Sequence, residues 1–446
     1  MSCAVPPAGW RGRAALCIVA RMNSKTILLV GNGGREHAMA AAIRSTAPGV
    51  ELLIAPGNPG TAQLGRNVEV AADDVPGLLA LARAERVGLT IVGPEAPLAA
   101  GIGDAFAAER LPLFGPSAAA ARIESSKAFA KQLMFDEGVP TAQFKVFTAP
   151  DAALDYVRSG SGPVVVKASG LAAGKGAIVC SDREEAERAV REVMVDRRFG
   201  SAGDELVVEE FMEGEELSVF FLSDGVTAVP LVPSRDHKRL LEGDLGPNTG
   251  GMGAYSPVRG ADADLIDRIR TEVAEPVLAG LASRGSPYQG FLYAGLMLTA
   301  AGPKVIEFNC RLGDPEAQVV LPLTRSDLVE PMDAVARGGS LGGWTPDLSP
   351  GAALVTVVVS GGYPGSYAKG IPIEIPTNLE DPSVHLYHAG TALGPDGLVT
   401  AGGRVFGVTG IGADLAEAAA RSRAAAARIR FDGATWRKDI GRSELG

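Results

Sequence analysis

The sequence has few of the residues that cross-link chains or ligate metals, with four cysteines and four histidines among 446 residues. Cys3, Cys17, Cys180 and Cys310 form no C-x-x-C pair, which argues against a disulfide framework or a zinc site. This cysteine usage is typical of a reducing cytoplasm. No run of 18 apolar residues occurs, so the sequence predicts no membrane-spanning helix. We therefore expect a cytoplasmic protein without a membrane partner.

Positive charge is also scarce. The chain carries 42 Lys and Arg against 52 Asp and Glu, a formal net charge of −10. Non-specific binding to nucleic acid requires a cationic surface, so nucleic acid is excluded as a partner. An anionic small substrate is not excluded, because a few local cations can hold it within a negative protein.

The length predicts about three domains at roughly 150 residues each. We expect residues 1–21 to be a disordered extension, with Arg11 and Arg13 ahead of a short apolar stretch. The predicted domains are 22–123, 124–345 and 346–446.

In the first domain, short apolar runs at 26–30, 51–55 and 89–92 read as strands, with helical stretches between them. This rhythm predicts an α/β, Rossmann-like domain with a parallel sheet. Glycine-rich loops follow the strands at 31–34, 56–60 and 93–97. Because ligands bind beyond the carboxyl ends of parallel strands, we expect the three loops to meet around one ligand.

The first of these loops, GNGGREH, resembles a dinucleotide fingerprint but breaks it. Gly31 and Gly33 fit the pattern, whereas Glu36 occupies the third glycine position. The acidic residue expected after the second strand is also missing, so a nicotinamide cofactor is disfavoured. A helix N-terminus with free N–H groups suits a phosphate instead. The alternative is a glycine turn without a ligand.

The second domain reads as mixed or antiparallel strands, at 163–167, 177–180, 206–211, 216–222, 293–299 and 304–309. The segment KASGLAAGKGA, 167–177, lies between two of them and lacks P-loop spacing. A flexible glycine hairpin with a lysine near each end can fold over a triphosphate. The alternative is a mobile surface hairpin.

Glu307 and Asn309 stand two apart on the last of these strands, so both side chains face one side. A carboxylate and an amide oxygen suit Mg²⁺ that bridges phosphates. Arg311 follows on the same face and can clamp a carboxylate or phosphate. The alternative, a charged edge strand, fits the apolar neighbours poorly.

Residues 234–257 read as a long loop with little regular structure, and long loops in compact domains are usually functional. Asp236 there is a candidate for an ammonium group, and 248–251 offer backbone N–H groups to a carboxylate. The acidic segment 209–216 suits an adenine hinge; a solvated turn is the alternative. Strands at 352–360 and 403–410 with a helix at 415–429 predict a small C-terminal α+β domain.

Together these segments resemble the ATP-grasp ligases and, more narrowly, the phosphoribosylamine–glycine ligases. The motifs that carry the resemblance are GNGGREHA, APGNPGTA, VGPEAPL, SSKAFAK, KASGLAAGKG, VEEFMEGEELS, GPNTGGMGAYSP and EFNCRLGDPE. The resemblance implies that 124–345 is an ATP-grasp domain. It also implies a monomeric enzyme of purine biosynthesis that joins glycine to 5-phosphoribosylamine through glycyl phosphate, with ATP and Mg²⁺ or Mn²⁺. The alternative is another ATP-grasp carboxylate–amine ligase.

The resemblance also implies a role for each matching residue. The residues expected at ATP are Lys127, Lys167, Gly174, Lys175, Gly176, Glu209, Glu210, Phe211, Met212 and Glu216. The metal ligands are Glu307 and Asn309, and the catalytic residues are Lys175, Asp236 and Arg311. The residues expected around glycine and phosphoribosylamine are Gly31, Asn32, Gly33, Gly34, Arg35, Glu36, Asn58, Gly93, Pro94, Glu95, Asp236, Thr249, Gly250, Gly251 and Arg311.

Overall fold

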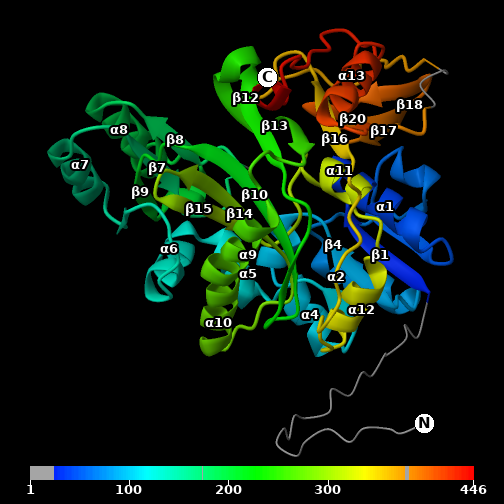
Figure 1. Cartoon of the computed structure of the whole chain (residues 1–446), viewed down its shortest axis with the longest axis horizontal. Helices are drawn as coiled ribbons and strands as arrows, with labels where there is room; N and C mark the ends of the chain where they lie inside the picture. Colours follow the sequence, from blue (N-terminus) through cyan, green and yellow to red (C-terminus); the bar gives the residue numbers. More distant parts are fainter. Residues whose placement is uncertain (1–24, 173, 377–380, 446) are drawn as a thin grey trace, which may run out of the picture.

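The computed structural model describes residues 25–172, 174–376 and 381–445. The expected extension at 1–21 lies outside these residues. In Figure 1 the blue N-terminal part and the orange and red C-terminal part lie side by side, and the green middle part reaches away from them. Within the described stretches, no helix has both the length and the apolar character needed to cross a bilayer.

The N-terminal part is built on a parallel sheet in the order β3-β2-β1-β4-β5, as predicted. Its β1 is buried throughout, which explains the unbroken apolar run in the sequence. The strands are β1 (Thr26–Gly31), β2 (Glu51–Pro56), β3 (Arg66–Asn67), β4 (Leu89–Val92) and β5 (Leu113–Phe114). The helices are α1 (Gly34–Thr46), α2 (Val75–Ala84), α3 (Glu95–Ala99), α4 (Ile102–Ala108) and α5 (Ala118–Ser125).

The middle part contains two antiparallel four-stranded sheets, which fits the prediction of mixed or antiparallel strands. The first has the order β6-β9-β7-β8 and the second β11-β10-β14-β15. In the first the strands are β6 (Phe144–Phe147), β7 (Val164–Ala168), β8 (Ala177–Cys180) and β9 (Leu206–Glu210). In the second they are β10 (Glu215–Ser223), β11 (Ala228–Pro230), β14 (Gly290–Thr299) and β15 (Gly302–Asn309).

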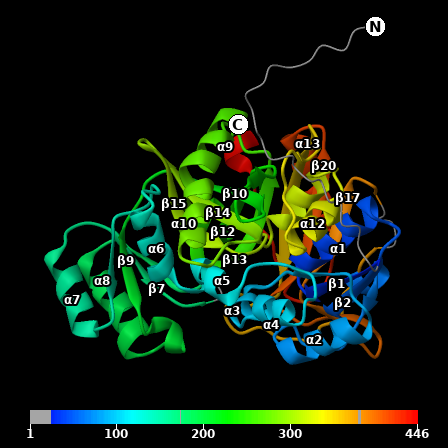
Figure 2. The same ribbon diagram turned by 90° about the horizontal axis from the view of Figure 1, so that it is seen from below.

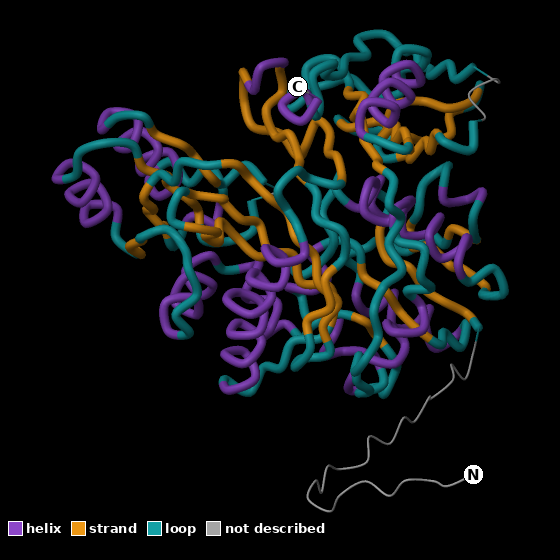
Figure 3. The backbone as a smooth tube through the Cα atoms, viewed as in Figure 1, coloured by secondary structure: helices purple, strands orange, loops and turns teal. Residues whose placement is uncertain are grey.

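Helices cover the outer surfaces of these two sheets. Helices α7 and α8 lie at the end of the middle part that is farthest from the N- and C-terminal parts (Figures 1 and 3). Their apolar residues share one core cluster with β7 and β9. Ser126 caps α6 by accepting a hydrogen bond from Phe129 N at 3.2 Å. The helices are α6 (Lys127–Asp136), α7 (Pro150–Ser159), α8 (Arg183–Val190), α9 (Ala263–Ile269) and α10 (Glu275–Ser283).

The prediction that residues 234–257 form an irregular loop is wrong. The segment is a hairpin of β12 (Arg235–Leu241) and β13 (Leu245–Ser256). Glycine, asparagine and proline are depleted in strands, so the local pattern of β13 hid it. What stabilises β13 is pairing with β16 (Ala352–Val359), about a hundred residues later in the chain, and a local reading cannot see such a partner.

The C-terminal part therefore shares a sheet with the middle part, in the order β12-β13-β16-β20-β17. The remaining strands are β17 (Val384–His388), β18 (Thr391–Gly394), β19 (Gly397–Thr400) and β20 (Arg404–Gly412). The remaining helices are α11 (Ala317–Val320), α12 (Val329–Ala336), α13 (Leu415–Ala426) and α14 (Arg442–Leu445). A Cβ on Gly410 would lie 2.2 Å from the carbonyl oxygen of Ala418, so glycine lets α13 lie directly on β20.

Histidines join the N-terminal part to β17, which lies beside α1 in Figures 1 and 2. The backbone N–H of His388 donates to His37 Nδ1 at 2.8 Å, and the His37 ring packs edge-on to Tyr387. Burial lowers the pKa of His37 to about 3, helped by the neighbouring His388 and His385, and lowers that of His388 to about 4. His37 and His388 therefore serve a structural role at this contact.

The first prediction concerns the pH dependence of stability. Below about pH 6.5 the unfolded chain protonates its histidines while folded His37 stays neutral, so the unfolding free energy falls as the pH falls. His37→Gln keeps an acceptor for His388 but removes one titrating group. We expect its stability to fall less steeply between roughly pH 6 and 4.5, by about 1.4 kcal/mol per pH unit. Urea unfolding across this range measures the slope; equal slopes in both proteins would contradict the assignment.

Candidate active site

Three lysines of the middle part, here called the lysine cluster, lie near Glu307. Lys127 begins α6, Lys167 lies on β7 and Lys238 lies on β12. Burial alone would raise the pKa of Glu307, but these three lysines and Arg311 outweigh burial and lower it. Lys167 and Glu307 lie far apart in the sequence but close in space, since Lys167 Nζ donates to the carbonyl of the adjacent Ile306 at 3.3 Å, and the carboxylate stays ionised.

Next to the lysine cluster, Glu209 on β9 lies between two lysines. Its Oε2 is 2.9 Å from Lys167 Nζ and 3.1 Å from Lys131 Nζ, and all three side chains are at most 5% exposed. Burial lowers the pKa of Lys131 to about 8 despite the carboxylate. Sequence reasoning did not single out Lys131, although it lies one helical turn after Lys127.

A β-bulge shapes the strand that carries the predicted metal ligands. In β15, Val305 pairs with Leu296 while Glu307 pairs with Gly295, so Ile306 is the extra residue. The bulge leaves the Ile306 carbonyl free to accept a hydrogen bond from Lys167 Nζ at 3.3 Å. Glu307 and Asn309 then share a face, as predicted, while Val305 and Phe308 join the core.

The predicted adenine hinge is only partly open to a ligand. The backbones of Glu209 and Glu210 are paired within the sheet, and the Glu210 carboxylate binds Lys304 at 2.9 Å. Phe211, which follows β9, is 40% exposed. Any hinge contact with adenine therefore falls to Phe211 and Met212. Glu216, expected at the ribose, forms an ion pair with Lys238.

Arg311 forms ion pairs with two carboxylates. Glu95 begins α3 in the N-terminal part, and Glu124 lies near the end of α5, where the N-terminal part joins the middle part. Arg311 lies 3.1 Å from Glu124 and 3.4 Å from Glu95. Glu124 also accepts a hydrogen bond from the backbone of Cys310 at 2.7 Å. With the amide of Asn309 in its satisfied orientation, Nδ2 donates to Glu124 at 2.8 Å and Oδ1 turns toward donors. Glu124 was not predicted, because nothing in its local sequence distinguishes it from a surface glutamate.

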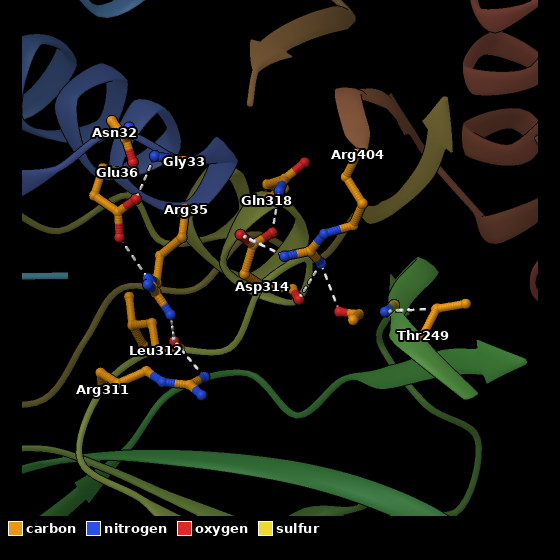
Figure 4. Close-up of polar contacts among 12 residues, drawn as sticks. Asn32, Gly33, Arg35, Glu36, Thr249, Arg311, Leu312, Asp314, Gln318 and Arg404 are labelled. Atoms are coloured by element: carbon orange, nitrogen blue, oxygen red, sulfur yellow. Dashed lines mark hydrogen bonds and ion pairs between the residues drawn. The ribbon is translucent and has the colours of Figure 1, made fainter. Parts of the chain in front are cut away.

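The glycine loops of the parallel sheet do meet, but the protein's own carboxylate occupies the space between them. Glu36 Oε2 accepts a hydrogen bond from Gly33 N at 2.6 Å (Figure 4). A Cβ on Gly31 or Gly93 would lie within 2.5 Å of the Glu36 side chain. The prediction of free N–H groups for a phosphate at this helix N-terminus is therefore wrong at Gly33. Asn58 links the second loop to the first by donating to Asn32 O at 2.9 Å.

Arg35 extends this network toward Arg311. Its Nε donates to Glu36 at 2.6 Å, and its guanidinium also donates to the carbonyl of Leu312 at 3.2 Å. Arg311 donates to the same carbonyl at 3.3 Å, so the two arginines lie side by side in Figure 4. Two guanidinium groups at one edge of the sheet suit an anionic substrate group.

The glycines of β13 are also engaged within the protein. Gly250 N donates to the Tyr363 hydroxyl at 2.9 Å, and Gly251 N donates to Thr249 Oγ1 at 3.0 Å. The expectation that these N–H groups are free for a carboxylate therefore does not hold. Instead, β13 brings Thr249 and Gly250 alongside the loop that follows β15 (Figure 4).

Asp236 on β12 has an unusual charge environment. Burial raises its pKa to about 7, and Glu316 and Glu216 add to the increase, while Lys238 at 3.4 Å opposes it. A carboxylate with this pKa exchanges a proton readily near neutral pH. The site thus contains a group suited either to pair with an ammonium or to accept a proton.

The glycine-rich hairpin predicted at 167–177 joins β7 to β8, with Lys167 opposite Ala177. Residue 173 lies outside the described part. Lys175 Nζ reaches across to the carbonyl of Pro364 at 3.3 Å. A cavity of about 1250 Å³ separates this hairpin from β12, β13 and the C-terminal part, with Lys175, Asn248 and Tyr363 in its lining. The hairpin therefore has open space on the side of the C-terminal part.

The residues present fit a divalent cation only with help from a ligand. Among the described residues, no group of three or more His, Cys, Asp and Glu side chains is arranged to hold a metal. Glu307 is ionised and Asn309 Oδ1 is turned away from Glu124, so the protein offers two oxygens on one face. Cations that bridge nucleotide phosphates usually take few protein ligands.

Comparison with known families accounts for nearly all of the described chain. Residues 25–124, 125–317 and 353–443 match the N, ATP-grasp (A) and C domains of phosphoribosylglycinamide synthetase. The chain belongs to the phosphoribosylglycinamide synthetase family. The predicted fold class and the resemblance to this family are therefore confirmed, and like other ATP-grasp ligases its members use ATP and a divalent metal.

The relatives include single-function and multifunctional proteins. Phosphoribosylamine–glycine ligase of Allochromatium vinosum is 50% identical, over 93% of this chain and 97% of its own length. The trifunctional purine biosynthetic protein adenosine-3 of Gallus gallus is 48% identical over 93% of this chain. The chain spans only 42% of the length of that protein.

Solved structures agree on the fold. Phosphoribosylamine–glycine ligase of Thermotoga maritima is 34% identical, with a TM-score of 0.81, over 93% of this chain and all of that one. Biotin carboxylase of Campylobacter jejuni is only 17% identical, with a TM-score of 0.72 over 95% of each chain. The second similarity establishes the fold alone.

The second prediction compares two adjacent glutamates on β9. Glu209→Gln leaves Lys131 and Lys167 buried without a counter-charge, so the unfolding free energy should fall by about 3 kcal/mol. The half-exposed Glu210 pairs with Lys304, and Glu210→Gln is the matched control, with an expected cost below about 1 kcal/mol. Urea unfolding of both variants measures the difference. Equal losses would contradict the buried role of Glu209.

Proposed function

We propose that this protein joins glycine to 5-phosphoribosylamine at the expense of ATP, giving glycinamide ribonucleotide, ADP and phosphate in de novo purine biosynthesis. The observation that carries the proposal is the convergence of Lys127, Lys167 and Lys238 on Glu307, with Lys167 Nζ bound to the carbonyl of the neighbouring Ile306 at 3.3 Å. Family membership across all three domains supports it. The names of the full-length relatives supply the two substrates.

In the first step, a glycine carboxylate oxygen attacks the γ-phosphorus of ATP, and ADP leaves. Lys127 and Lys167 lie where they offset the negative charge that spreads over the transferred group. Glu209 holds Lys167 in place and shares the same carboxylate oxygen with Lys131. Lys175 lies on the glycine-rich hairpin, and closure of this hairpin over bound ATP would exclude water.

Glu307 and Asn309 are the residues that would hold a divalent cation, and we propose Mg²⁺ or Mn²⁺ as the ion. Oxygen ligands and few protein contacts are typical of Mg²⁺ with a nucleotide. A cation bound there supplies positive charge to the phosphates. Titration of activity with each metal separately tests which of the two ions the protein uses.

In the second step, the amine of phosphoribosylamine attacks the carbonyl carbon of glycyl phosphate and phosphate leaves. Arg311 is placed beside the loops proposed to hold phosphoribosylamine, where its guanidinium can bind an anionic oxygen. Asp236 is placed to pair with the glycine ammonium or to accept the proton that the attacking amine loses. The catalytic roles of Lys175, Asp236 and Arg311 are part of this proposal.

The decisive experiment uses the full chain with ATP, Mg²⁺, glycine and freshly made phosphoribosylamine. Mass spectrometry should detect glycinamide ribonucleotide, with one phosphate released per product. Phosphate release that needs a different acid or amine would favour another ATP-grasp carboxylate–amine ligase instead. The monomeric state and the cytoplasmic location stay predictions, which sedimentation and cell fractionation can test.

The third prediction removes the central carboxylate. Glu307→Ala should lower kcat by roughly a hundredfold or more, because the transferred phosphoryl group loses its charge environment. Glu272→Ala, which breaks an exposed ion pair with Arg268, is the control and should keep full activity. Steady-state kinetics together with thermal unfolding separates lost catalysis from lost folding. Unchanged turnover in Glu307→Ala would remove this residue from the site.

A further inference from the structure

Arg404, at the start of β20, joins three segments that are distant in the sequence. One guanidinium nitrogen donates to Gly250 O at 2.5 Å and to Asp314 O at 2.6 Å. The other terminal nitrogen lies 3.0 Å from Asp314 Oδ2 (Figure 4). An arginine of the C-terminal part thus fixes β13 and the loop after β15 at once.

Gly250 is held from both sides by the C-terminal part. Its carbonyl accepts from Arg404, and its N–H donates to the Tyr363 hydroxyl at 2.9 Å. A Cβ on Gly250 would lie 3.3 Å from both Arg404 Cζ and the Tyr363 oxygen. The two side chains therefore close directly on the backbone of this glycine, which leaves β13 little freedom here.

Asp314 carries the connection on to the glycine loop of the N-terminal part. Its Oδ1 accepts a hydrogen bond from Gln318 Nε2 at 2.9 Å. Its Oδ2 lies 3.4 Å from the position of a Cβ on Gly33, and the Gln318 side chain lies 2.5 Å from that of Gly34. The pair of Arg404 and Asp314 therefore stands where all three domains meet.

We propose that Arg404 is a positioning residue for the second half of the reaction. By fixing Gly250 and Asp314, it holds the loop after β15, which carries Arg311, against the loop that carries Gly33. The amine of phosphoribosylamine and the acyl phosphate of glycine can then meet. The inference rests on the proposed function. Arginine suits the task because its planar fork serves two carbonyls and a carboxylate together, which the single ammonium of lysine cannot do with the same geometry.

The proposal predicts a specific defect. If the two loops drift apart, water replaces the amine at the carbonyl carbon of glycyl phosphate, the bond to phosphate breaks, and glycine and phosphate are released. ATP is then consumed without product. Lys167 and Lys238 have their own carboxylate partners within the middle part, Glu209 and Glu216, so the first step should proceed.

The fourth prediction is tested with Arg404→Met. Phosphate released per glycinamide ribonucleotide should rise from one to roughly two or more, and KM for phosphoribosylamine should rise about tenfold. KM for ATP should stay within about twofold of wild type. Phosphate release and product are measured in the same reaction, because a merely less stable enzyme loses both in proportion.

Three further variants sharpen the test. Arg421→Met is the matched control, since Arg421 also binds a carbonyl and a carboxylate within the C-terminal part, at Ile411 and Glu417, and should stay fully coupled. Tyr363→Phe removes the other bond to Gly250 and should uncouple weakly, even if Arg404→Met does not fold. Arg404→Lys should be intermediate.

The outcomes separate the two proposals. A wild-type enzyme that forms no glycinamide ribonucleotide would reject the proposed function and this role with it. A coupled wild-type enzyme with equally coupled Arg404→Met and Tyr363→Phe variants would reject the role of Arg404 alone. Equal uncoupling in Arg421→Met would also reject it, because the defect would then reflect general damage to the C-terminal part.

Discussion

Several lysines of the middle part must stay charged although they are largely withdrawn from water. This requirement constrains where the rest of the structure places its carboxylates. A lysine that loses water without gaining a partner loses its proton instead. Glu209 meets this need for Lys131 and Lys167, and Glu216 and Asp236 meet it for Lys238. Burial lowers the pKa of Lys127, and Glu307 opposes that shift. Glu209 lies on β9 in the first sheet of the middle part, and Glu307 lies on β15 in the second sheet. The two sheets must therefore face each other across the lysine cluster.

The β12–β13 hairpin, which carries Lys238, belongs to a sheet that continues from the middle part into the C-terminal part. Strand β13 pairs with β16, so the hairpin that carries Asp236 and Lys238 is anchored in the C-terminal part. The end of the chain holds this hairpin as well. Arg437 donates to Asp244 at 2.7 Å, and Glu444 accepts a hydrogen bond from Tyr255 at 3.1 Å. The C-terminal part thus determines where the substrate side of the site stands.

What the sequence predicted correctly was local. The parallel strands, the hairpin between Lys167 and Ala177, and the shared face of Glu307 and Asn309 all follow from short-range patterns. What it missed depended on distant partners. β13 needs β16, and Glu124 gains its role only when it meets Arg311, far along the chain.

The glycine loop shows a different limit of sequence reasoning. Free space beside Gly31, Gly33 and Gly93 was read as room for a phosphate, but Glu36 fills it. Glycine spacing reports that something approaches the backbone closely, and it cannot report whether that is a ligand or a side chain. Only the position of Glu36, where the dinucleotide pattern wants a third glycine, hinted at the answer.

These pairings explain how a protein with a net charge of −10 can serve polyanionic substrates. Lys131, Lys167 and Arg311 are already paired with carboxylates before any substrate binds. The site is therefore not a strongly positive patch. Binding must then depend on geometry and on the divalent cation expected to accompany the nucleotide, more than on the protein's own excess charge.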